Sequence, residues 1–153
     1  MKRRRFPAHR NPVAAAILRA GIRRDVADLK TTAELQAWTG ADAAKLVNSA
    51  GRMMWMVAGA AVACGVDEDS PDVRITRGMG EALGDLAADG RLEQHRPAIQ
   101  SGLLALERLL PKCSDWALGT AALKLDELLA TTAGMGTSDF RNLLDTASIN
   151  SGK

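Results

Sequence analysis

Residues 97–111 read PAIQSGLLALERLLP, and their apolar residues recur at helical spacing. An apolar row with steps of three, four or seven positions lies on one face of an α-helix and consists of Leu92, Ile99, Leu103, Leu106 and Leu110. Pro97 suits the first turn of such a helix, and Pro111 ends it. This pattern predicts an amphipathic helix that packs its apolar face into a bundle.

The flanking segments carry further helix signals. Ser70 followed by Pro71 predicts a helix start, and Gly90 is a C-terminal glycine for the same helix. Ser114 is expected to cap the next helix, and Ser138 is expected to cap a last short one. Helices therefore continue on both sides of residues 97–111.

The first third of the chain divides into shorter predicted helices. One begins at Pro12, has Val13 and Ile17 on its apolar face, and ends near Gly21. After that glycine, Ile22, Val26 and Leu29 recur at helical spacing. Thr31 and Glu34 have the spacing of a capping box, which predicts another helix start. Residues 41–64 form the longest and most apolar predicted helix of the chain.

The composition supports the same fold class. Hydrophobic residues make up 46% of the 153 residues, charged residues 25% and aromatic residues 3%, with no Tyr. Ala, Leu, Val and Met carry the apolar content, which favours helices over strands. We expect an all-α protein, a compact bundle of five or six helices over residues 12–148. A flexible basic arm, residues 1–11, precedes it, and a frayed tail, residues 149–153, follows.

Charge is distributed unevenly along the chain. Residues 1–24 hold eight cations and no acid, whereas the remainder has 12 basic and 18 acidic residues, a net charge of −6. Pro7 and the clustered cations before it disfavour a helix at the start. Such a segment is typical of nucleic-acid binding through phosphates, independent of base sequence. The predicted contacts are Lys2, Arg3, Arg4, Arg5, Arg10, Arg19, Arg23 and Arg24.

Three other interpretations of the arm stay open. It docks on the acidic body of its own or a neighbouring subunit, it increases solubility, or it is a targeting segment. Phe6 is the only aromatic residue in the arm, so base stacking has no support and no sequence-specific readout is predicted.

A second candidate site lies where Met53, Met54, Trp55 and Met56 stand in a row. Four neighbouring residues point to all sides of a helix, so this helix is apolar all round and must be covered. Met53, Trp55 and Met56 are therefore candidates for a partner interface or a homodimer interface. The alternative is that this helix is simply the central one of the bundle.

No motif indicates catalysis. His9 and His95 have no Cys or acidic residue at metal-ligand spacing, so neither a metal nor a cofactor is expected. Cys64 and Cys113 are predicted to be buried free thiols in a reducing compartment. The longest uncharged run, residues 53–66, is shorter than the roughly 20 residues of a membrane span. We expect a cytoplasmic protein that is not an enzyme and has no catalytic residues.

Arg10-Asn11-Pro12-Val13, the apolar spacing of residues 98–110 and the segment WALGTAALKLDEL, residues 116–128, carry a family resemblance. With these features the chain resembles short helical proteins encoded in proteobacterial genomes and mobile elements. The resemblance implies a bacterial cytoplasmic setting. It also implies a rival function, a protein-binding module that acts as an inhibitor or adaptor through its acidic helical face or its Met-rich helix.

Overall fold

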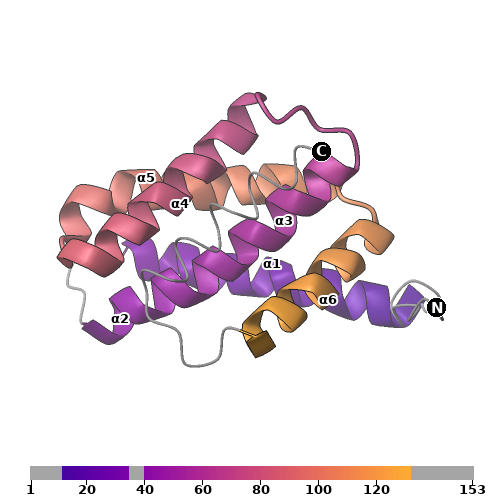
Figure 1. Cartoon of the computed structure of the whole chain (residues 1–153), viewed down its shortest axis with the longest axis horizontal. Coiled ribbons are helices and arrows are strands. Elements are labelled where there is room, and N and C mark those ends of the chain that lie inside the picture. The colour runs from indigo at the N-terminus through magenta and orange to yellow at the C-terminus, as the bar shows by residue number, and fades with distance from the viewer. Residues whose placement is uncertain (1–11, 35–39, 132–153) are drawn as a thin grey trace.

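A computed structural model of the protein describes residues 12–34 and 40–131, and every regular element in these ranges is helical (Figure 1). Helix α2, the π-helical turn η2 and helix α3 follow one another without a break, so the described chain forms five helical rods. The prediction of an all-α bundle is confirmed. In chain order the elements are α1 (Pro12–Glu34), α2 (Gly40–Lys45), η2 (Leu46–Ala50), α3 (Gly51–Ala63), α4 (Pro71–Asp89), α5 (Leu92–Leu109), the 3-10 turn η3 (Leu110–Lys112) and α6 (Asp115–Thr131).

Helices α4 and α5 form a hairpin. Gly90 ends α4 with φ of 67°, a left-handed conformation that glycine adopts without the strain a Cβ would add. The chain reverses there, and α5 packs along α4. A Cβ added to Gly102 of α5 would lie 2.3 Å from Cβ of Met79 on α4, so the two backbones approach as closely as a glycine allows.

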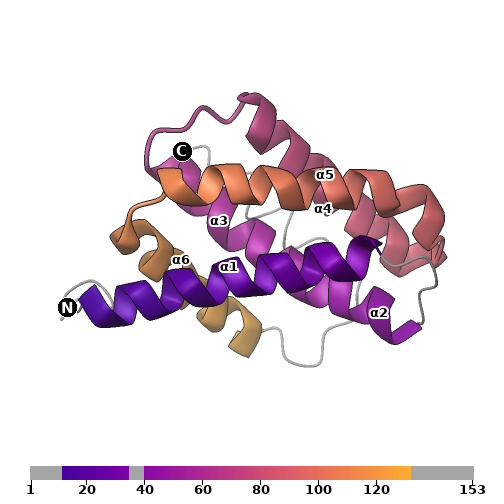
Figure 2. The same cartoon turned by 180° about the vertical axis from the view of Figure 1, so that it is seen from behind.

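The other helices pack around this hairpin. Helix α1 runs beside α5 (Figure 2), and α6 runs beside α3 (Figure 1). The core lies between these pairs, because each helix turns its apolar stripe inward. The largest fully buried side chains are Leu29, Leu46, Val57, Thr76, Met79, Leu86, Ile99, Leu103, Leu106, Leu109 and Leu118.

Helix α1 is longer than predicted. It continues through Gly21 to Glu34, although a glycine inside a helix costs about 0.5–1 kcal/mol relative to alanine. The buried row from Ile22 through Leu29 to Ala33 compensates for this cost, since it keeps one apolar stripe against the core. The expected end at Gly21 is therefore wrong, because burial outweighs local propensity.

The capping box at Thr31 and Glu34 is also wrong. The Thr31 hydroxyl donates to the carbonyl of Ala27 at 3.2 Å, and the Thr32 hydroxyl donates to the carbonyl of Asp28 at 3.0 Å. Both threonines thus bond back into the preceding turn of α1, as such residues do within a helix.

The helix predicted over residues 41–64 is present as one continuous rod over residues 40–63, but it contains a π-helical turn. After α2 the chain makes the π-helical turn η2 before α3 begins at Gly51. Leu46 and Ala50, the first and last residues of the turn, are both buried. The rod as a whole spans 24 residues, one more than α1, so it is the longest helical stretch among the described residues, as predicted.

Helix α5 begins earlier than expected. Its first residue is Leu92, and Pro97 lies inside it. Because Gly90 reverses the chain at once, only Gly90 and Arg91 separate α4 from α5, and α5 forms despite the hydrogen bond that Pro97 cannot donate.

The start of α6 is as predicted. The Ser114 hydroxyl accepts the backbone N–H of Ala117 at 3.1 Å, which is the bond of an N-cap residue. The starts at Pro12 and Pro71 are confirmed as well. The predicted helix after Ser138, the arm of residues 1–11 and the tail of residues 149–153 lie outside the described residues.

Candidate functional site

The predicted cationic site reaches into the described structure on helix α1. Arg23 and Arg24 are exposed, on a part of the helix whose opposite side is buried through Ile22 and Val26. The Arg24 side chain is 76% exposed, and its Nε lies 3.9 Å from a carboxylate oxygen of Asp25. Such a pair at the surface is weak, so the Arg24 guanidinium remains accessible to a phosphate.

Arg19 has a different role. Its Nη1 donates to the carbonyl of Leu110 at 3.1 Å, and its Nη2 donates to the carbonyl of Cys113 and to Asp115 Oδ1, both at 2.8 Å. Only 21% of the side chain is exposed. Arg19 therefore joins α1 to the end of η3 and the start of α6, and we leave it out of the phosphate-binding set.

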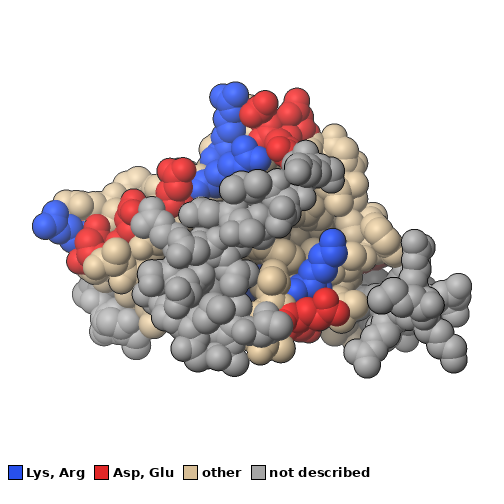
Figure 3. Space-filling view, viewed as in Figure 1, with Lys and Arg blue, Asp and Glu red and all other residues tan. Residues whose placement is uncertain are grey.

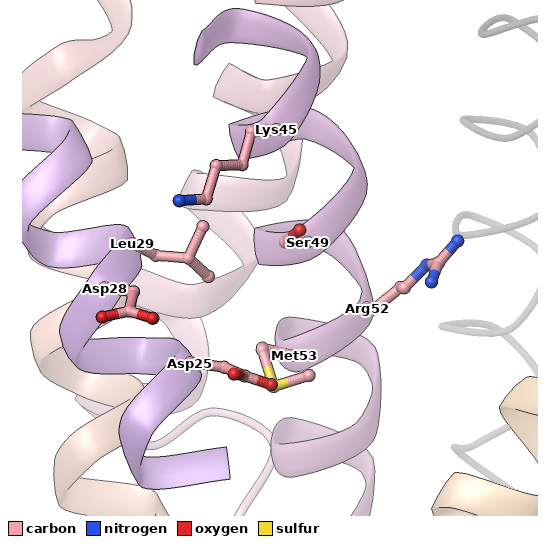
Figure 4. A pocket seen from close by; sticks show the side chains of 7 residues that line it. All are labelled: Asp25, Asp28, Leu29, Lys45, Ser49, Arg52 and Met53. Carbon is pink, nitrogen blue, oxygen red and sulfur yellow. The ribbon is translucent and has the colours of Figure 1, made fainter. Parts of the chain in front are cut away.

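The sign of the charge changes immediately after Arg24. Asp25 and Asp28 follow on α1, and they line a cleft of about 210 Å³ together with Leu29, Lys45, Ser49, Arg52 and Met53. Figure 4 shows the Lys45 side chain reaching over Leu29 toward α1, whereas Arg52 points away from it. This cleft mixes both signs of charge and is smaller than the roughly 300–1,000 Å³ of typical ligand pockets. The cationic segment therefore ends at Arg24, where Asp25 and Asp28 begin the lining of this cleft.

Basic and acidic residues alternate elsewhere on the molecule. Figure 3 shows them interspersed on one face of the described residues. Arg108 pairs with Asp72 at 2.8 Å, Arg77 with Glu68 at 3.6 Å and Lys30 with Glu107 at 3.1 Å. Each of these contacts pairs a cation of the helical body with a carboxylate. The remaining predicted phosphate contacts, Lys2, Arg3, Arg4, Arg5 and Arg10, lie outside the described residues.

The Met-rich segment lies at the centre of the bundle. Met56 is 4% exposed and belongs to the core, so its prediction as an interface residue is corrected. Met53 and Trp55 are partly buried and pack against the core. Helix α3 contacts α4, α5 and α6, which explains why its sequence is apolar on all sides. The central-helix interpretation accounts for these residues.

Several apolar side chains are exposed, and two of them, Val13 and Ile17, were predicted on a buried face. Val13 and Ile17 are each 67% exposed, one turn apart on the outer side of α1, and Trp116 on α6 is 52% exposed. The sequence could have indicated that Ile17 is exposed, because its position on the helix is on the side of α1 away from Ile22 and Leu29. Dividing the helix at Gly21 concealed this position.

The two cysteines differ in exposure. Cys113 is buried and free, as predicted, but Cys64 is exposed, because it follows the last residue of α3 and lies at the surface. Burial, with a smaller contribution from nearby Cys64, raises the pKa of Cys113 to about 11. The thiol of Cys113 therefore stays protonated near neutral pH.

Three further observations limit the candidate sites. Within residues 12–34 and 40–131, no three His, Cys, Asp or Glu side chains are grouped as metal ligands would be. No helix in these ranges combines the length and apolar character needed to cross a bilayer. Comparison with protein-family models, with curated proteins and with solved structures finds no match, and the resemblance to mobile-element proteins stays a prediction.

Proposed function

We propose that this protein binds nucleic acid through phosphate contacts of its N-terminal segment. The observation that carries the proposal is the charge distribution: eight cations and no acid in residues 1–24, followed by a remainder with a net charge of −6. A dense run of Lys and Arg gains affinity for a polyanion by releasing its counterions, whatever the base sequence.

The proposed contacts are the arm residues together with the exposed arginines of α1. Arg23 and Arg24 continue the charge of the arm onto a rigid element, and a guanidinium can hold two phosphate oxygens at once. Arg19 is excluded because its donors serve Leu110, Cys113 and Asp115. The full set is Lys2, Arg3, Arg4, Arg5, Arg10, Arg23 and Arg24.

Binding to duplex DNA and to RNA across a salt series tests this proposal. If the five arm cations meet phosphates on duplex DNA, deleting residues 1–11 should reduce the slope of log affinity against log salt by about 4.5. Replacing Arg23 and Arg24 by Ser should reduce the slope by about 1.8 on the same basis. The control is Lys124→Ser, which removes an exposed cation of α6 in the acidic body and should leave the slope nearly unchanged.

The result against the proposal is equally clear. If the deletion and the double arginine variant bind both nucleic acids as the full chain does at every salt concentration, phosphate recognition by this segment is excluded.

A second candidate function is a protein-binding module. The observation in its favour is the exposed pair Val13 and Ile17, since apolar side chains add nothing to phosphate contacts but can anchor a protein partner. The test compares proteins retained from a nuclease-treated host lysate by the full chain, by Ile17→Asp and by Ala27→Asp, a matched exposed position on the same helix. Retention lost only in Ile17→Asp supports this candidate, and identical retention by all three rejects it.

A further inference from the structure

The two cysteines of the chain, 49 positions apart in sequence, meet where α3 ends and α6 begins. Cys64 follows the last residue of α3, and its Sγ accepts the backbone N–H of Ser114 at 3.3 Å. The same sulfur lies 3.5 Å from the Ser114 hydroxyl oxygen. Ser114 is the residue next to Cys113, so the exposed thiol rests against the backbone that carries the buried one.

The two cysteines lie close to each other. Standard bond lengths place the Cα of Cys113 about 2.4 Å from the Ser114 nitrogen, so Cys64 Sγ is within about 6 Å of that Cα. The two thiols are also near enough to interact, since Cys64 contributes to the raised pKa of Cys113. At present Cys113 Sγ points inward and lies 3.5 Å from the carbonyl oxygens of Val57 and Leu109. A rotation about its Cα–Cβ bond turns the sulfur toward Cys64.

We propose that Cys64 and Cys113 are a redox site that closes reversibly into an intrachain disulfide. The oxidant is a low-molecular-weight disulfide such as oxidised glutathione. The Cys64 thiolate attacks one of its sulfurs, forms a mixed disulfide and releases one glutathione thiolate. Cys113, once its Sγ has turned out of the core and given its proton to solvent, attacks Cys64 Sγ as a thiolate and releases the second glutathione as a thiolate. The protons lost by the two cysteines balance those gained by two glutathione thiols.

The order of the two steps follows from exposure. Cys64 is open to solvent, whereas Cys113 is 3% exposed and its thiol is kept protonated by burial. Attack on a soluble disulfide needs an accessible thiolate, so Cys64 reacts first and Cys113 acts as the resolving residue.

The site also touches helix α1. The carbonyl of Cys113 accepts the Arg19 guanidinium at 2.8 Å, and Asp115 accepts the same group. The disulfide would therefore close at the point where α1, α3, η3 and α6 meet. This inference is independent of the proposed nucleic-acid binding, because Arg19 and the two cysteines are outside the phosphate-binding set.

The experiment equilibrates the full chain with mixtures of reduced and oxidised glutathione, blocks free thiols by alkylation, and maps the peptides by mass spectrometry. The expected product is a monomer lighter by two hydrogen atoms, with the Cys64 peptide linked to the Cys113 peptide, and dithiothreitol should reverse it. In Cys64→Ser, Cys113 should remain a free thiol. This variant replaces an exposed side chain, so it keeps the fold.

A comparison in urea separates a native arrangement from the chance meeting of two thiols in one chain. The effective concentration of one thiol at the other should be at least about tenfold higher in the folded chain than in the unfolded chain. An effective concentration in the folded chain that is less than about tenfold above that in the unfolded chain overturns the proposal. So does a product that stops at a glutathione adduct on Cys64, or one that links two chains while Cys113 stays reduced.

Discussion

The α4–α5 hairpin and helix α1 are held in the bundle in different ways. The hairpin depends on close backbone approach, with Gly102 against Met79 and only Gly90 and Arg91 between the helices. It also has an ion pair, Arg108 with Asp72 at 2.8 Å. Helix α1 adds polar contacts to residues far away in sequence. Lys30 pairs with Glu107 at 3.1 Å, and the Gln100 amide donates to the carbonyl of Ala33 at 3.3 Å. Close backbone packing distinguishes the hairpin, and hydrogen bonds and ion pairs to residues distant in sequence distinguish α1.

The difference concerns function as well as stability. Helix α1 carries one arginine that serves the fold, Arg19, and two that remain exposed, Arg23 and Arg24. Substitutions in the two regions should therefore fail in different ways. A defect in the hairpin should lower stability alone, whereas substitutions along α1 should separate stability from binding.

The largest effect is expected from Gly102→Ala. The new Cβ would overlap Met79 Cβ, an atom that cannot move without its backbone, so α4 and α5 must separate. Overpacking of this kind costs about 1–3 kcal/mol of the free energy of unfolding. Urea unfolding followed by circular dichroism measures this loss.

Gly21→Ala is the matched control in α1. No atom lies within 4 Å of a Cβ added there, and the residue is helical. The change should raise the free energy of unfolding by about 0.4–1 kcal/mol, because alanine restricts the unfolded chain more than glycine does. Equal losses in both variants would show that the hairpin is no more closely packed than α1.

The next effect is expected from Arg19→Met. The substitution keeps much of the aliphatic stem but leaves the carbonyls of Leu110 and Cys113 and the Asp115 carboxylate without this donor. Lost hydrogen bonds to a charged group should cost about 2 kcal/mol in urea unfolding. Binding to duplex DNA should stay within about twofold of the full chain wherever both are folded.

Arg23→Met should weaken DNA binding and leave stability nearly unchanged, the reverse of Arg19→Met. The side chain is exposed, so the free energy of unfolding should change by no more than about 0.5 kcal/mol. Affinity for DNA should fall, and the salt slope should shrink by about 0.9. If Arg19→Met weakens DNA binding as much as Arg23→Met does, the division of α1 into structural and binding arginines is wrong.

The hairpin was largely readable from the sequence. The steps between Ile99 and Leu110 predict the buried face of α5, and Ser70-Pro71 with Gly90 gives the bounds of α4. These signals are local, because each involves residues within a few turns of one another. They also predicted the N-cap at Ser114.

The polar contacts of α1 could not be predicted in this way. Arg19 meets Asp115 across 96 positions, and Cys64 meets Ser114 across 50, so no local spacing contains either contact. The exposed position of Ile17 on the helix could be predicted, but a helix end at Gly21 separates Ile17 from the buried row that begins at Ile22. By contrast, the sequence alone shows the cationic segment of residues 1–24. Only the structure removes Arg19 from the proposed phosphate contacts, because it shows the hydrogen-bond partners of Arg19.

A smaller effect separates two serines that precede helices. Ser114→Ala removes the hydroxyl that accepts the Ala117 N–H and should cost about 1 kcal/mol. Ser70 holds the same position before α4, but its side chain makes no cap bond. Ser70→Ala should therefore cost clearly less than Ser114→Ala in thermal unfolding. The reverse order would contradict the assignment of Ser114 as the cap of α6.

The smallest effect is expected at the turn of the hairpin, where the polar contacts are local. The Asp89 carboxylate accepts the N–H of Arg91 at 2.8 Å and contacts the His95 ring at 2.9 Å. The hydrogen bond from Arg91, followed by that from His95, lowers the pKa of Asp89 below its usual value near 3.8. A carboxyl with a lowered folded pKa stabilises the protein above its unfolded pKa and loses that effect as pH falls through its folded pKa.

Asp89→Asn should therefore lower the melting temperature slightly at pH 7, and the difference from the full chain should shrink below about pH 4 and vanish at lower pH. Glu81→Gln, an exposed change on the same helix, should show no such convergence. A difference that persists at pH 2 would mean that shape, not the carboxylate charge, stabilises the turn, as it does between Gly102 and Met79. Convergence would show that the turn is stabilised by charge, as the other end of the hairpin is by the Arg108–Asp72 pair at 2.8 Å.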